Sequence, residues 1–147
     1  MNTVIITKNG TLAALAAIGS AVAGWLGGWD AALKVLTAFM VADYITGVAL
    51  AAVWRKSKKS KSGAVSSAAG FKGLCKKGVI LLVVWVTTLL DKALGAEYVR
   101  TATVLFFIGN EGISLLENLG MMGIPFPAFL QTALEALQDK GDKGETE

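Results

Sequence analysis

The chain has 147 residues, of which 54% are hydrophobic and only 17% are charged, and its mean hydropathy is +0.57. This composition is too apolar for an ordinary soluble domain and predicts a membrane protein. The net charge is +3, and the sequence contains one cysteine, Cys75, and no histidine. An intrachain disulfide framework is excluded, and the common histidine-containing metal and catalytic constellations are missing. We therefore expect no enzyme, no metal site and no cofactor.

The first apolar stretch covers residues 10–29, which as a helix would be about 30 Å long and would cross a bilayer. Trp25 and Trp29 near its end are typical of a water interface. A cleaved signal peptide is the alternative, because Lys8 precedes the stretch and Ala21-Val22-Ala23 resembles a cleavage site. Small residues at four-residue intervals would let another helix, of this chain or of another subunit, approach closely: Ala16, Ser20, Gly24 and Gly28.

Three further apolar stretches are long enough to cross a membrane: residues 33–54, 78–96 and 101–120. The sequence thus predicts an all-α membrane protein with about four transmembrane helices, or three if the last lies in the interface. Asp43 falls near the middle of the second stretch, with Thr46 and Gly47 close by. We expect Asp43 either to brace the neighbouring loop as a structural carboxylate or to face a lumen. If it needs a positive partner, the nearest candidates are Lys72, Lys76 and Lys77.

A basic segment without acids, residues 55–77, separates the second and third stretches. The positive-inside rule places it in the cytoplasm, and with four spans both termini are then cytoplasmic. Lysines this close to a membrane also favour anionic lipids, whereas no aromatic interleaving supports nucleic-acid binding. Its basic residues are Arg55, Lys56, Lys58, Lys59, Lys61, Lys72, Lys76 and Lys77.

Polar residues interrupt the last apolar stretch, where an ionisable side chain costs roughly 2.5 to 3.5 kcal/mol at the centre of a helix. At 100° per residue they share an arc of about 120°, broken only by Phe107. This polar stripe either lines water or an oligomer interface, or makes hydrogen bonds between helices without enclosing water. It consists of Thr103, Asn110, Glu111, Ser114, Glu117 and Asn118.

The chain ends in polar sequence. Pro125 and Pro127 stop the last apolar helix, and residues 128–137 then have the spacing of a short amphipathic helix that lies on the membrane surface. Residues 138–147 are expected to be a disordered polar tail. The chain is thus predicted to hold one membrane domain, residues 1–137, followed by this tail.

Four blocks, in this order, resemble the toxin-secretion and phage-lysis holin family over roughly residues 30–137. They are Asp43-Tyr44-Ile45-Thr46-Gly47; Ser67 with Gly70-Phe71-Lys72-Gly73 and Lys76-Lys77-Gly78; Asn110-Glu111-Gly112-Ile113-Ser114-Leu115-Leu116-Glu117-Asn118; and Gly123-Ile124-Pro125-Phe126-Pro127. The third block is the most specific of the four.

The resemblance implies a multi-pass protein of the bacterial host's cytoplasmic membrane that forms homo-oligomers. Its lesions or pores would release a cell-wall hydrolase or a toxin as cargo that is not specifically bound. A separate antiholin is a possible partner. Two other classes also fit a small membrane protein with an embedded carboxylate or a basic loop: a proton-coupled multidrug or ion transporter, and a non-conducting membrane scaffold.

Overall fold

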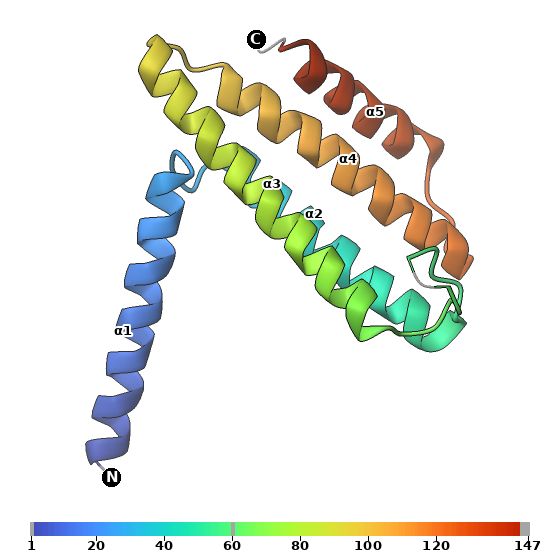
Figure 1. Cartoon of the computed structure of the whole chain (residues 1–147), viewed down its shortest axis with the longest axis horizontal. Helices are drawn as coiled ribbons and strands as arrows, with labels where there is room; N and C mark the ends of the chain where they lie inside the picture. Colours follow the sequence, from blue (N-terminus) through green and yellow to red (C-terminus); the bar gives the residue numbers. More distant parts are fainter. Residues whose placement is uncertain (1, 60, 145–147) are drawn as a thin grey trace.

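The computed structural model describes residues 2–59 and 61–144, which form helices joined by short connections (Figure 1). In chain order the elements are α1 (Asn2–Trp25), α2 (Ala31–Ala49), the π-helix η1 (Leu50–Trp54), α3 (Ser67–Leu94), α4 (Val99–Met122) and α5 (Ala128–Lys143). The part of the chain that the structure describes contains no strand. The all-helical class predicted from the sequence is therefore confirmed.

Helices α2, α3 and α4 lie side by side as a bundle, and α5 folds back along α4 (Figure 1). We call the end of the bundle where residues 55–66 join η1 to α3, and where α4 stops, the basic end. The opposite end carries the α1–α2 and α3–α4 connections. Helix α1 leaves that end at a steep angle (Figure 1), and it contacts the bundle at its last residue, where the centroid of the Trp25 ring lies 6.3 Å from that of the Trp85 ring in α3.

Local chemistry sets where the helices begin and end. The Asp30 carboxylate caps α2 by accepting a hydrogen bond of 2.8 Å from the Leu33 amide, and Ser66 caps α3 in the same way through the Ala69 amide. Gly95 ends α3 with a φ of 64°, a left-handed conformation that glycine adopts without a steric penalty. These caps turn the chain back, so that consecutive spans are antiparallel.

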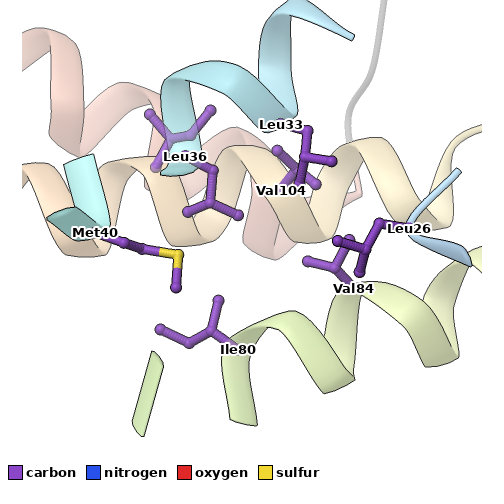
Figure 2. Packing of buried hydrophobic residues seen from close by; sticks show 8 residues of the cluster. Leu26, Leu33, Leu36, Met40, Ile80, Val84 and Val104 are labelled. Carbon is purple, nitrogen blue, oxygen red and sulfur yellow. The ribbon is translucent and has the colours of Figure 1, made fainter. Parts of the chain in front are cut away.

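The apolar core lies between α2, α3 and α4, toward the opposite end of the bundle. In Figure 2, side chains of α2 face those of α3, with α4 completing the cluster. Leu33, Leu36, Val84 and Val104 are completely shielded from solvent. Leu26, which follows α1, also enters this core and is the point at which the α1 end of the chain joins the bundle.

Among the described residues, three helices are long and apolar enough to cross a membrane: Ala31–Trp54, Ser67–Leu94 and Val99–Met122. The expected fourth crossing at residues 10–29 is not confirmed. Residues 101–120, which the sequence left open as a stretch lying in the interface, fall in the candidate span Val99–Met122. The first stretch is not among the three.

Two other boundaries differ from the sequence prediction. Helix α3 begins at Ser67 rather than residue 78, so Lys72, Lys76 and Lys77 lie on a helix and not in a loop. Helix α5 continues to Lys143, so residues 138–143 of the expected disordered tail are helical, while residues 145–147 lie outside the described residues. In both cases packing against another helix stabilises a segment whose composition alone favours a loop.

Candidate functional site

A cluster of charged side chains lies in the middle of the bundle and joins all three spans. Lys77 of α3 donates a hydrogen bond of 2.8 Å to Oδ2 of Asp43 in α2 and another to Oε2 of Glu111 in α4. Asp43 is 4% exposed, Lys77 8% and Glu111 0%. We call these three residues the ionic cluster. It places one buried cation between two buried carboxylates.

Polar side chains of α4 satisfy the second oxygen of Asp43. Ser114 donates its hydroxyl to Asp43 Oδ1 at 2.7 Å, and Asn118 donates its side-chain amide to the same atom at 3.0 Å. Asn118 also donates to the Thr46 hydroxyl at 3.1 Å. Because residues 111, 114 and 118 are three and four positions apart, they lie on one face of α4, from which Ser114 and Asn118 meet α2 and Glu111 meets α3. Asp43 is thus held by three hydrogen-bond donors on two helices.

Glu111 is less completely paired than Asp43. Its Oε2 accepts the bond from Lys77, but its Oε1 is buried and has no hydrogen-bond partner within the described structure. The nearest second cation is Lys76, whose Nζ lies 3.7 Å from Oε1. Similarly, Lys59 of the basic loop places Nζ 3.7 Å from Asp43 Oδ2. The side chains of Lys59 and Lys76 are more than half exposed, so two exposed lysines also lie close to the cluster.

The cluster lies deep along each span. Asp43 is eleven residues from the end of η1, Lys77 ten from the start of α3, and Glu111 eleven from the end of α4. At 1.5 Å per residue, each residue therefore lies about 15 Å along its helix from the helix terminus at the basic end. The hydrocarbon core of a bilayer is about 30 Å thick, so this is the depth of its centre when the helix ends lie at the interface. Only mutual pairing makes such charges tolerable there.

Half of the polar stripe predicted on α4 belongs to this network. Glu111, Ser114 and Asn118 contact α2 or α3, which corresponds to the hydrogen-bonding alternative for these three residues. Asn110 is half-buried, Glu117 is exposed, and the Thr103 hydroxyl donates to the Val99 carbonyl of its own helix. A lumen-facing or intersubunit role for the six residues remains a prediction.

Thr46 and Gly47, which were predicted to act together with Asp43, lie close to the polar stripe of α4. Thr46 accepts from Asn118, and a side-chain carbon added at Gly47 would lie 3.7 Å from the Asn118 amide nitrogen and 3.7 Å from Lys59 Nζ. Of the three lysines expected as partners of Asp43, Lys77 makes the direct contact. In the sequence, the feature that pointed to Lys77 was its position directly before the third apolar stretch.

The basic residues outside this network stay near the surface. Arg55 follows η1 with a φ of 52°, and Lys56, Lys58 and Lys61 are exposed in the loop. Lys72 is exposed on α3. A role for these side chains at the membrane surface remains a prediction.

The small-residue ridge is mostly exposed. Ala16, Ser20 and Gly24 of α1 are exposed, whereas Gly28 follows the helix and is half-buried, and a carbon added at Gly24 or Gly28 would meet no atom of the described residues within 4 Å. Packing of Ala16, Ser20 and Gly24 against the described part of the chain is therefore not observed. Contact with another subunit remains a prediction.

A second polar arrangement, which sequence reasoning missed, closes the opposite end of the bundle. Arg100 at the start of α4 donates to Asp30 Oδ2 at 2.6 Å and to the Gly28 carbonyl at 3.3 Å. Asp91 of α3 accepts from the backbone amides of Val99 and Arg100 at 3.0 and 2.9 Å, and so caps α4. Partial burial acts to raise the pKa of Asp30, but its bonds from Arg100 and Leu33 outweigh that effect and hold the pKa below its usual value.

Helix α5 contacts α4 very closely through glycines. A carbon added at Gly109 would lie 2.6 Å from the Leu134 carbonyl oxygen, and one added at Gly112 would lie 2.6 Å from the Leu134 side chain. Further along, Gly141 of α5 approaches the backbone of Phe106. Residue numbers rise along α5 as they fall along α4, so the two helices are antiparallel. At Gly109 and Gly141 an added carbon would meet backbone atoms, so a side chain there would separate the helices, whereas at Gly112 it would meet only the ends of the Leu134 and Phe39 side chains.

The chain matches a family model, the bacteriophage holin family, over residues 20–139. An uncharacterised protein of Clostridium perfringens is 41% identical over 121 residues, which are 80% of this chain and 84% of that protein. An uncharacterised protein of Listeria innocua is 40% identical over 128 residues, covering 85% and 86%. A probable holin of Bacillus phage phi105 is 34% identical over 113 residues, covering 76% and 77%. No solved structure matches the chain.

Proposed function

Because the chain belongs to the bacteriophage holin family, we propose that it assembles into homo-oligomers in the cytoplasmic membrane of a bacterial host and opens lesions there. The lesions release a cell-wall hydrolase or a toxin, without specific binding of that cargo. The chain itself is a multi-pass membrane protein of this family. Timing is set by its own association and, where one exists, by a separate antiholin.

One observation carries the proposal. The residues that match the family include all three candidate spans, and these fold around an ionic cluster while their outer surfaces remain apolar. Val41 and Ile45 of α2 and Val79 and Leu82 of α3 are more than half exposed. Exposed aliphatic side chains on spanning helices suit contact with lipid or with further copies of the chain. The bundle thus has the surface of a subunit that acts within the bilayer.

The basic end predicts how the protein is oriented across the membrane. Loop residues 55–66 and the lysines at the start of α3 face the cytoplasm under the positive-inside rule, where they also attract anionic headgroups. Helix α4 then ends on the cytoplasmic side, and the α1–α2 connection lies outside. A cytoplasmic N-terminus requires α1 to cross the membrane as a fourth helix in the assembled protein.

The ionic cluster stabilises the separate subunit. Its bonds join α2, α3 and α4, so the spans cannot separate without exposing charge to lipid. Association of subunits must therefore either preserve the cluster or replace its bonds with bonds to other copies or to water. The cluster is in this way a stability element whose strength influences when lesions form.

The test is induction of the chain in bacteria together with a cell-wall hydrolase that lacks its own export signal. Membrane potential, growth and hydrolase activity outside the cells are followed in parallel. The proposal expects a delay, then abrupt depolarisation and release of the hydrolase. Continued growth with proton-coupled drug resistance would instead identify a transporter, and an intact membrane with no resistance would identify a scaffold.

A further inference from the structure

Helix α5 carries charge to the depth of the membrane centre. Leu134 lies against Gly109 and Gly112, which flank Glu111 of the ionic cluster, and Gly141 reaches the level of Phe106 (Figure 1). Glu135, next to Leu134, is therefore at about the same depth as Glu111, and it is exposed. The helix does not merely lie at the basic end, where the sequence alone placed a surface helix.

The exposed polar side chains of α5 gather on one side of the helix. At 100° per residue, Gln131, Glu135, Asp139 and Asp142 fall within about 80° of one another, and Gln131 donates to Glu135 at 2.9 Å. Phe129 and Ala133 lie on a different side of the helix. One charged side chain facing lipid at the depth of Glu135 costs roughly 2.5 to 3.5 kcal/mol, and Asp139 and Asp142 follow it on the same face toward the opposite end of the bundle. Such a face is stable at membrane depth only when it is in contact with water.

The polar stripe of α4 is poorly placed to meet that water. Glu111 is completely buried, and Asn118 is 4% exposed and engaged with Asp43 and Thr46. Exposing them would break bonds between three helices. The face of α5, by contrast, is already exposed while α5 remains on α4, and the opposite flanks of α2 and α3 are apolar.

We propose that the wall of the water-filled lesion is formed by the polar face of α5, with Gln131, Glu135, Asp139 and Asp142 lining it, while α4 stays behind as its support. This inference rests on the proposed function, since it assigns the lumen surface of the same lesion. Each subunit places α5 toward the lumen and the apolar flanks of α2 and α3 toward lipid or neighbouring subunits. The ionic cluster remains intact in the open state.

The experiment measures ion selectivity of the full-length protein in planar bilayers under a salt gradient. Rings of acidic side chains favour cations, so Glu135→Lys and, separately, Asp139→Lys are expected to lower the cation-to-anion permeability ratio about twofold or more. Glu117→Lys makes the same charge change on the exposed part of the α4 stripe and is expected to leave the ratio unchanged. A change with Glu117→Lys but with neither α5 variant, or no change with any of the three, overturns the assignment.

A disulfide tether tests whether α5 stays on α4 in the open lesion. In a Cys75→Ser background, Gly112→Cys and Leu134→Cys replace two residues that are in direct contact. The oxidised protein is expected to conduct with unchanged selectivity. Conductance that disappears on oxidation and returns on reduction would show that α5 must leave α4, which overturns the inference but not the proposed function. Unmodified protein that never conducts would overturn both.

Discussion

Lys77 and Glu111 lie 34 residues apart in the chain and form an ion pair that joins α3 to α4 in the centre of the bundle. Asp43, also 34 residues from Lys77, accepts from the same ammonium group at 2.8 Å. One cation therefore serves two carboxylates at a depth where neither can be solvated by bulk water. The consequences of removing each partner differ, which makes the cluster open to mutational tests.

Removal of the cation is expected to be the most damaging single change in the cluster. Lys77→Met leaves Asp43 and Glu111 buried without the ammonium group between them, and breaking a buried pair in this way costs about 3 to 5 kcal/mol. Thermal unfolding of the detergent-solubilised protein should show a large loss of stability, with less protein accumulating in membranes. Lys58→Gln, which changes an exposed loop lysine, is the matched control and should unfold like the wild type.

Glu111→Leu is expected to insert normally and to change the time of lysis or abolish it. The substitution removes the least satisfied carboxylate of the cluster, whose Oε1 has no hydrogen-bond partner, and leaves Asp43 paired with Lys77. Lysis timing after induction, compared at equal membrane levels of the two proteins, is the measurement. Wild-type timing would show that the carboxylate has no functional part.

Replacing the whole ionic cluster should separate stability from function. In the triple variant Asp43→Asn, Lys77→Met, Glu111→Leu, no buried charge is left in the ionic cluster, and asparagine still accepts from Ser114 and Asn118. Such replacements are often neutral or stabilising by about 1 to 4 kcal/mol, so the triple variant should unfold at or above the wild-type temperature. If it is as unstable as Lys77→Met alone, unpaired charge is not the cause of that variant's instability.

The contact between α4 and α5 depends on the missing side chain at Gly109. In Gly109→Ala the new carbon would lie 2.6 Å from the Leu134 carbonyl oxygen, so α5 must move, at a cost of about 1 to 3 kcal/mol. Limited proteolysis should cleave within α5 faster than in the wild type. Gly78→Ala makes the same change on α3 in open space and should leave the cleavage rate unaltered.

The Arg100–Asp30 ion pair predicts a dependence of stability on pH. The folded-state pKa of Asp30 lies below the usual value of 3.8, so the folded protein binds this proton less readily than the unfolded chain. The stabilisation is present above the unfolded pKa and is lost as the pH falls through the lower, folded value. Unfolding temperatures measured from pH 7 to pH 3 should therefore fall less steeply in Asp30→Asn than in the wild type. Equal slopes would contradict a contribution from this carboxylate.

Much of the architecture follows from local sequence. Hydropathy located α2 and α4 to within two residues at each end, counting η1 with α2, because a long apolar run between polar turns has few alternatives to a spanning helix. Hydropathy placed the start of α3 eleven residues late, because Lys72, Lys76 and Lys77 resemble a loop until their partners are known. It also ended α5 at residue 137, since a glycine such as Gly141 disfavours a helix unless another helix packs against it.

The sequence by itself determined the class of the protein, the positions of its apolar helices and the free-energy cost of placing Asp43 and Glu111 within them. It also showed the resemblance to holins, which the family match confirms. Helical periodicity also gathered Glu111, Ser114 and Asn118 on one face. Only the tertiary structure decided that this face meets Asp43 and Lys77, and that α5 brings Glu135 to about the same depth. Periodicity gives the angle between side chains of one helix, whereas the partners of a buried charge depend on how separate helices are rotated and packed against each other.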